Sequence, residues 1–482
     1  MSYDLCVSTC GAGIWDVPGG QSGRWLNFSR TFSTWLLPFI AMISQLPLGG
    51  DTAFENAVSL LLNVGSPTLA AYSATLTVLN SRWIHRRFSR ISYPNAQSAA
   101  TVLNNLQQSP LDVTRDDSLL FSLIVLPEND EWWSELLIFL DLKHAYTWSF
   151  SNITSIIWVV VAFLLTLIDA FTNMPKDSFT PNGLGVGFAW LWILAIITCC
   201  LNTGPRCDST ILRDAIRRAN RKAYVATHSG QPTLLDFGPN QSPVISLDTD
   251  LGSLRTDEGR PAPIYNYARL TPWSISVERV HAAFSAASYR AARSNRQGSR
   301  EELARYIRLP RSSRDSRLHL IHGLDSRSLH SVFMALSLTW GTIGAAILLD
   351  WNTLTKSLAC RSGSYLIYGL ASSLIWGMLM ASSRLSSRSL LSRSPPQRTP
   401  DRLSFSVQCA IIMRRTTKVL ACMNAIWIVF TCGLQFAGRY DTCWCNSSVL
   451  YLTAVIKIFY HGKIGLELGY PITVGNFYLR EK

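Results

Sequence analysis

Long apolar stretches with almost no charge recur along this chain and alternate with polar, basic stretches. An apolar stretch of about 20 residues predicts a transmembrane helix, because such a helix crosses the hydrocarbon layer and satisfies its own backbone hydrogen bonds. Seven segments fit this description, at 31–48, 56–79, 149–171, 184–201, 330–349, 364–382 and 419–437. The pattern predicts an all-α, polytopic helical membrane protein with about seven transmembrane helices and a partly disordered cytosolic loop.

The first segment and a short apolar stretch near the C-terminus are the weakest parts of this pattern. Segment 31–48 contains Pro38 and Pro47, and proline removes a backbone donor and kinks a helix, so a re-entrant or tilted segment is an alternative. Stretch 449–463 is short and contains Lys457. We interpret it as an interfacial helix rather than an eighth span.

The second segment, 56–79, is interrupted in its middle. Asn63, Gly65, Ser66 and Pro67 follow one another within a few residues. Glycine and proline both disfavour a helix interior. The sequence therefore predicts a broken helix here, or a short helix followed by a second one.

Basic residues fix the expected orientation, because cytosolic connections carry an excess of Lys and Arg. Connections 49–55, 172–183 and 350–363 hold few basic residues, whereas arginines follow the second, fourth and sixth spans. This asymmetry places the N-terminus in the cytosol, or outside if 31–48 is re-entrant. The expected organisation is an N-terminal tail (1–30), spans one and two (31–79), a cytosolic or interfacial region (80–148), spans three and four (149–201), a basic cytosolic loop (202–329), spans five and six (330–382), a Ser/Arg-rich cytosolic loop (383–418), span seven (419–437) and a C-terminal tail (438–482).

The three cytosolic regions differ in composition. An apolar run at 119–127 is too short to span, so we expect it to pack on the membrane face. Segment 228–275 is rich in Gly, Pro, Ser and Asp and is typical of a loop or disordered linker. Segment 383–404, rich in Ser and Arg, is also expected to be disordered.

Composition and charge agree with a membrane protein. Only 16% of residues are charged and 48% are hydrophobic, whereas a soluble domain carries about 25% charged residues. The net charge is +13, but the positive residues lie beside apolar spans, so we expect the lipid bilayer and not a nucleic acid as the partner. Plasma membrane, vacuole and endoplasmic reticulum all fit this composition.

An arginine series at helical spacing raises a more specific lipid contact. Arg290, Arg293, Arg296 and Arg300 would share one helix face. Such a face can meet anionic lipid headgroups, or it can simply be solvated. Protein partners are not indicated.

Cysteines suggest one covalent link and no metal site. Cys360 lies in the connection between spans five and six, and Cys443 and Cys445 follow span seven on the same expected side. A disulfide between Cys360 and one of these two is allowed on an oxidising face. A metal at Cys443-Trp-Cys445 would need two more ligands, and none is evident in the sequence.

Polar residues inside the spans are the usual sign of an ion or solute pathway. Asn63 and Asp169 are the positions that fit an intramembrane polar site. Asp169 lies near the end of its span, where it can reach water, and asparagine more often bonds between helices. We find no catalytic or cofactor-binding motif.

Four stretches carry a resemblance: WLLPFIAMISQLP (35–47), VGSPTLAAYSATLTVLNSRW (64–83), FAWLWILAIITCCLNTGPRCD (188–208) and DTCWCNSSV (441–449). The chain resembles uncharacterised multi-pass membrane proteins of filamentous fungi over much of its length. The resemblance implies a polytopic membrane protein and assigns no functional residue.

Three hypotheses about function follow. A long basic loop beside a charge-poor membrane core favours a non-enzymatic scaffold or sensor that acts through its cytosolic loops. The interruption at 63–67 favours a passive transporter or channel, because unwound backbone can line a site. A membrane-embedded enzyme is the third hypothesis.

Overall fold

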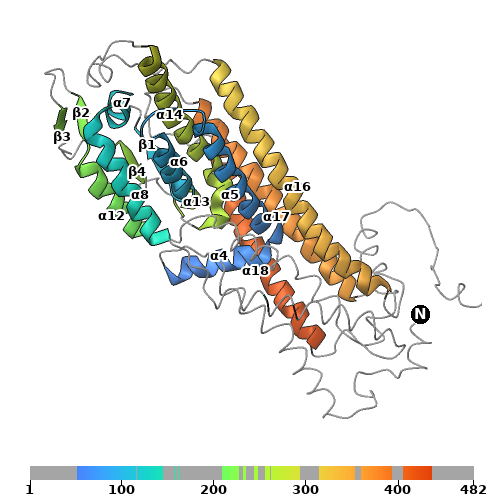
Figure 1. The fold of residues 1–482 in the computed structure, drawn as a ribbon. Helices are drawn as coiled ribbons and strands as arrows, with labels where there is room; N and C mark the ends of the chain where they lie inside the picture. The colour runs from blue at the N-terminus through green and yellow to red at the C-terminus, as the bar shows by residue number, and fades with distance from the viewer. Residues whose placement is uncertain are drawn as a thin grey trace, which may run out of the picture.

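The computed structural model describes residues 52–114, 117–144, 157, 161, 209–226, 232–234, 244–247, 256–260, 262–293, 314–352, 360–392 and 405–436. This part of the chain is mostly helical, as expected. It forms two packed regions, a bundle of long helices and a domain of shorter helices beside its upper end (Figure 1).

Three long helices build the bundle: α16 (Arg314–Asn352), α17 (Cys360–Ser392) and α18 (Phe405–Phe436). Their segments Ser326–Leu348, Cys360–Ser386 and Phe405–Gln435 are long and apolar enough to cross a membrane. They overlap almost all of the expected spans 330–349 and 419–437 and contain the whole of 364–382. Expected spans 31–48, 149–171 and 184–201 lie outside the described residues, apart from residues 157 and 161.

The Ser/Arg-rich loop is shorter than expected. Helix α17 continues to Ser392, and α18 already begins at Phe405, so much of 383–418 is helical. Arginines and serines do not stop a helix that neighbouring helices hold by packing. The interpretation of 383–404 as disordered is therefore wrong for residues 383–392.

Two helices separated by one residue replace the second expected span. Helix α4 (Ala53–Gly65) ends at the interruption and α5 (Pro67–Phe88) begins directly after Ser66. The prediction of a short helix followed by a second one is confirmed. Figure 1 shows α4 crossing the bundle at a steep angle, whereas α5 runs along α16.

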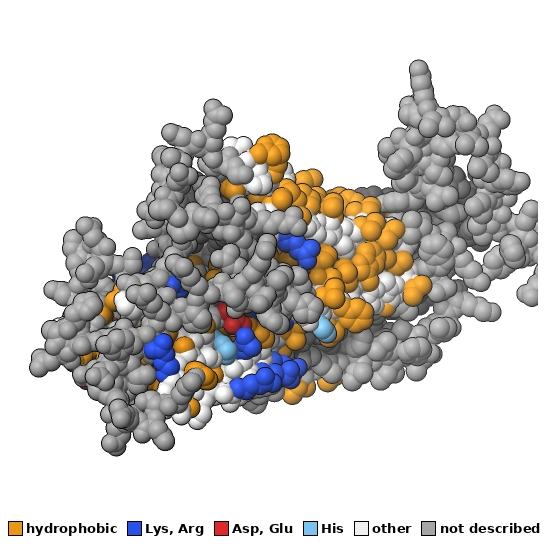
Figure 2. Space-filling view, turned by 90° about the horizontal axis from the view of Figure 1, so that it is seen from above, with side chains coloured by type: hydrophobic (Ala, Val, Ile, Leu, Met, Phe, Trp, Pro, Cys, Tyr) orange, Lys and Arg blue, Asp and Glu red, His pale blue; other side chains and the backbone are white. Residues whose placement is uncertain are grey.

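Apolar side chains on the bundle remain exposed, which is expected of a surface that faces lipid. They recur along α16, α17 and α18 at Leu329, Phe333, Leu374, Ile412, Val419, Met423, Ile426, Val429 and Phe430. Figure 2 shows the hydrophobic side chains gathered over one part of the molecule and the charged ones over another.

We name the second region the helical domain. Its elements are α6 (Ala96–Asn105), η3 (Leu106–Gln108), β1 (Leu111–Val113), α7 (Asp117–Val125), η4 (Pro127–Asn129), α8 (Asp130–His144), α12 (Ser209–Arg221), β2 (Tyr224–Ala226), β3 (Pro232–Leu234) and β4 (Ile245–Leu247). Strands β1 and β4 pair antiparallel, as do β2 and β3. The domain is completed by the ends of α5 and α14 (Asn266–Arg293).

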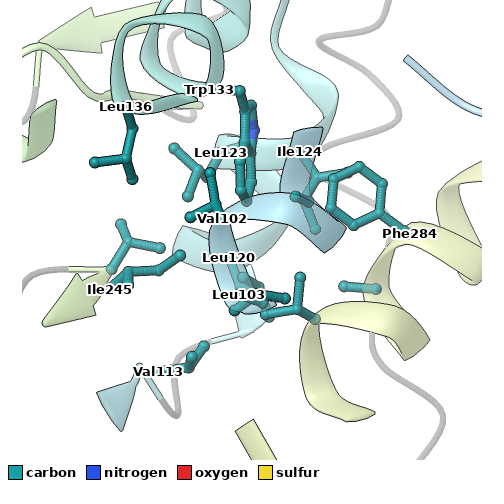
Figure 3. Packing of buried hydrophobic residues seen from close by; sticks show 14 of the residues in the cluster. Val102, Leu103, Val113, Leu120, Leu123, Ile124, Trp133, Leu136, Ile245 and Phe284 are labelled. Carbon is teal, nitrogen blue, oxygen red and sulfur yellow. The ribbon is translucent and has the colours of Figure 1, made fainter. Parts of the chain in front are cut away.

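One hydrophobic core unites these distant segments (Figure 3). Leu120 and Phe121 of α7 are fully buried in it, as are Trp133 of α8 and Phe284 of α14. The apolar run 119–127 therefore packs inside a protein core and not on a membrane face. A short apolar run can pack in a protein core or on a membrane face. Its own sequence does not distinguish the two, because the choice depends on residues far away in the chain that pack against it.

Segment 228–275 is also more ordered than the sequence predicts. Its described end contains α13 (Thr256–Gly259), η6 (Pro263–Tyr265) and the first turns of α14, with Ile264 and Tyr267 buried. The interpretation as a loop or disordered linker is wrong for these residues and for strands β3 and β4, which lie in the same segment. The polar residues of 256–260 and 262–270 are ordered because they dock on the bundle, where Asp257 bonds to Lys418 of α18.

Candidate functional site

The break between α4 and α5 is the most unusual feature of the bundle. Pro67 occupies the first turn of α5, where its missing N–H costs nothing. Ser66, with φ −142° and ψ 82°, caps that turn, and its Oγ accepts from the N–H of Leu69 at 3.3 Å. Local sequence chemistry therefore creates this break, as the interruption predicted.

Gly65 allows the break to enter the bundle closely. A Cβ atom at this position would lie 2.1 Å from the carbonyl oxygen of Ala421 in α18. Only glycine permits such an approach of two backbones. The residue that ends α4 therefore also sets how deeply α4 packs against α18.

Hydroxyl groups surround the first turn of α5. Ser66 Oγ donates to the carbonyl oxygen of Ser372 in α17 at 3.0 Å. Thr68 Oγ1 lies 2.9 Å from Ser372 Oγ and 3.1 Å from Thr339 Oγ1 in α16. All four side chains are buried, so their bonds stay inside the protein. We name Gly65, Ser66, Thr68, Thr339, Ser372 and Asn424 the polar junction.

The carbonyl end of α4 is bonded as well. Asn424 Nδ2 donates to the carbonyl oxygen of Gly65 at 2.7 Å, and Tyr368 Oη donates to that of Val64 at 2.5 Å. The last carbonyls of a helix lack partners within that helix, and in lipid an unbonded one is costly. α17 and α18 supply the missing donors.

A second cluster lies where residues 256–260 and 262–270, which we name the strap, meet the bundle. Asp257, fully buried, accepts from Tyr267 Oη at 2.8 Å and from the ammonium of Lys418 in α18. Arg260 lies 4.0 Å from Glu55 of α4, and Ser383 Oγ in α17 donates to the carbonyl oxygen of Tyr267 at 2.7 Å. These contacts tie the strap to three helices of the bundle.

Burial changes the acid–base properties of two strap residues. It raises the pKa of Tyr267 well above its usual value, and the charge of Asp257 acts in the same direction. It lowers the pKa of Arg269 to about 9. Arg269 donates from Nη2 to the carbonyl oxygen of Ala262 at 2.7 Å and to Asn266 Oδ1 at 2.8 Å, so these bonds offset part of the burial cost.

The structure places some of the expected site residues and leaves others untested. Asn63 is buried near the junction, but its Nδ2 donates to Ser59 in the same helix at 2.8 Å. Cys360 begins α17. Asp169, Cys443 and Cys445, like Arg296 and Arg300, lie outside the described residues, so the intramembrane site at Asp169 and the disulfide stay predictions.

Sequence reasoning missed most of the junction. Ser372, Thr339 and Thr68 are common residue types in apolar helices, and nothing in their spacing marks them. Asn424 had a signal, because an amide in an apolar span favours an interhelical bond, and it makes that bond. Asp257 had none, since its partner Lys418 is far away in the sequence.

The polar junction and the strap bond to free backbone groups at helix ends and hold the helices together. Among the described residues, they do not bring together side chains that could carry out a reaction. In that part of the chain, no three His, Cys, Asp or Glu side chains are grouped to hold a metal ion. Comparison with family models, curated proteins and solved structures finds no match to this chain.

Proposed function

We propose that this protein is a non-enzymatic integral membrane protein with about seven spans that acts as a sensor or scaffold through its cytosolic regions. One observation carries the proposal: the bundle and the helical domain share two helices, α5 and α14. A change in how the bundle packs would therefore move elements of the domain core.

Helix α5 runs from one core into the other without a break. Leu69 and Leu76 are buried in the bundle, whereas Ile84 and Phe88 are buried in the helical domain. Helices are stiff over such lengths, and packed cores respond to displacement by repacking as units. This continuity supports mechanical coupling between the two regions.

Helix α14 makes the same crossing beside α5. Tyr267 and Leu270 belong to the bundle core, and Trp273 and Phe284 belong to the domain core. Trp273 also packs against Trp83 of α5, with ring centroids 5.9 Å apart. The two shared helices therefore contact each other where the cores meet.

Arg327 of α16 contacts both α5 and α14 at the point where they pass from the bundle into the helical domain. Its guanidinium donates to Asn80 Oδ1 at 2.6 Å and to Ser274 Oγ at 3.3 Å, and it lies 3.9 Å from the centroid of the Trp83 ring. α16 carries one of the three segments in the described part of the chain that are apolar enough to span a membrane. A side chain near the start of that segment thus holds both shared helices.

The proposed partner is the bilayer, with anionic headgroups at its inner surface. Arg82 and Arg86 are exposed on α5, and Arg415 is exposed on α18. Figure 2 shows Lys and Arg side chains gathered beside the apolar surface of the molecule. Exposed arginines at such a boundary attract anionic lipids by about 1 kcal/mol each.

Hydrogen exchange in nanodiscs tests the coupling. We expect α7 and α8 to exchange at different rates in bilayers of short and long acyl chains, and Arg327→Met to weaken this dependence. Leu329→Ala, on the exposed side of the same helix, is the matched control and should keep it. Rates in α7 and α8 that are independent of bilayer thickness would contradict the proposal.

A passive pathway is the second candidate, favoured by the helix break among three apolar helices. Broken helices in transporters place helix ends and unwound backbone at a transported ion or solute. Ion and solute flux into proteoliposomes separates the candidates. Flux that Asn63→Ala or Asp169→Ala abolishes would favour the pathway over the sensor.

A further inference from the structure

We propose that residues 53–88 form a re-entrant hairpin, which enters the membrane from the inner side, turns at the polar junction and returns to the same side. This inference rests on the membrane placement of α16, α17 and α18 proposed above. It replaces the sequence-based interpretation of 56–79 as a crossing span, so the expected number of spans falls from seven to six.

The strap lies on the inner side of the bundle. It bonds to Ser383, near the end of the apolar segment Cys360–Ser386 of α17, and reaches from there as far as Lys418, three residues before Ala421 in α18. Tyr365 and Gln435 lie toward the opposite ends of α17 and α18 and bond to each other at 3.1 Å. Since the strap continues through α14 into the helical domain, its side is the side of that domain.

Both limbs of the hairpin reach the strap. On the α4 limb, Glu55 lies 4.0 Å from Arg260. On the α5 limb, Ser73 Oγ donates to the carbonyl oxygen of Ile264 at 3.3 Å, and Asn266 Nδ2 donates to Thr77 Oγ1 at 2.6 Å. A helix that crossed the membrane would place the limbs on opposite sides, and one short strap would not reach both.

The tip of the hairpin lies deep within the three long helices. Its partners are Thr339, Ser372 and Ala421. Each of these lies near the middle of its apolar segment, Ser326–Leu348, Cys360–Ser386 or Phe405–Gln435. The chain therefore turns at about mid-depth, where its free backbone groups bond to the surrounding helices as a lipid environment demands.

Length is consistent with this path. α4 has 13 residues, and a helix of that size is about 20 Å long, which is less than the roughly 30 Å hydrocarbon layer. α4 alone does not cross, and α5 leads back into the helical domain. Connection 49–55 then lies on the inner side, and the N-terminus lies outside if 31–48 crosses.

Single cysteines test the hairpin in sealed proteoliposomes of one orientation, with an impermeant thiol reagent and the eleven native cysteines changed to serine. The probes are Ala53→Cys and Ser89→Cys at the two exposed ends of the hairpin. Ser394→Cys, in the connection after α17, is the control for the inner side. Ser357→Cys, in the connection before α17, is the control for the outer side.

We expect Ala53→Cys, Ser89→Cys and Ser394→Cys to label from one side and Ser357→Cys from the other. Labelling of Ala53→Cys together with Ser357→Cys would overturn the hairpin and leave the membrane placement intact. Labelling of both controls from one side would instead overturn the placement of α17, and the hairpin with it.

A second experiment, which introduces a glycosylation site, tests the hairpin without removing the native cysteines. It is needed if the cysteine-free chain does not fold. A long acceptor loop inserted after Gly50 of the wild-type chain should remain unmodified in cells, whereas the same loop inserted after Ser357 should be glycosylated. Glycosylation at the first insertion would overturn the hairpin.

Discussion

The side-chain amide of Asn424 in α18 donates a 2.7 Å hydrogen bond to the backbone carbonyl of Gly65, the last residue of α4. Asn424→Leu should remove it and leave a buried carbonyl unbonded, which costs about 1–3 kcal/mol. Thermal unfolding in detergent measures the loss. Met423→Ala, exposed on the adjacent position, is the control, and an equal loss there would contradict a specific role for Asn424.

Gly65 should tolerate no side chain. Gly65→Ala places a Cβ 2.1 Å from the Ala421 carbonyl oxygen, so α4 and α18 must separate, at about 3 kcal/mol or more. Gly377→Ala in α17 is the matched control, because its Cβ meets nothing within 4 Å. That variant should be neutral or more stable by about 0.5–1 kcal/mol, as expected for a helix interior. Similar unfolding temperatures for the two variants would contradict the close approach.

The sequence could predict those parts of the fold that depend on local pattern. Apolar length located α16, α17 and α18, and the Ser66-Pro67 pair located the break. It could not predict the helical domain, because Trp133 and Phe284, whose ring centroids are 5.7 Å apart, meet only after separated segments fold together. It also missed the docked strap, since the composition of 228–275 is typical of a linker and Asp257 finds Lys418 only in three dimensions.

Alkaline pH should destabilise the chain partly through Tyr267. Burial and Asp257 raise its pKa well above the usual 10.0, so above about pH 10 the unfolded chain loses this proton while the folded chain keeps it. Stability from this group is complete below pH 10 and falls as pH rises further. Tyr267→Phe should flatten the dependence of unfolding free energy on pH above 10. Tyr289→Phe, with an exposed ring, should leave the slope unchanged.

The predicted disulfide of Cys360 can be tested by thiol labelling of intact cells. If it pairs with Cys443 or Cys445, an impermeant reagent should label the paired one of these two positions only after reduction. Cys409 and Cys422 carry free thiols and serve as controls whose labelling is independent of reduction once the protein is denatured. Labelling of Cys443 and Cys445 without reduction would contradict the pairing, and labelling only after permeabilisation would place the C-terminal tail in the cytosol.

The ion pair of Asp257 and Lys418 should decide whether the strap stays docked. Asp257→Asn keeps an acceptor for Tyr267 but leaves the Lys418 ammonium without its buried partner charge, at a cost on the order of 3 kcal/mol. Adding Lys418→Gln removes the uncompensated charge and should restore part of that loss. Hydrogen exchange of 262–270 should rise in the single variant and fall again in the double variant. If the losses of stability from the two substitutions were simply additive, direct pairing of Asp257 and Lys418 would be contradicted. If only α13 exchanged faster, the ion pair would not hold the strap. The remaining contacts, Arg260 with Glu55 and Ser383 with Tyr267, would then be sufficient.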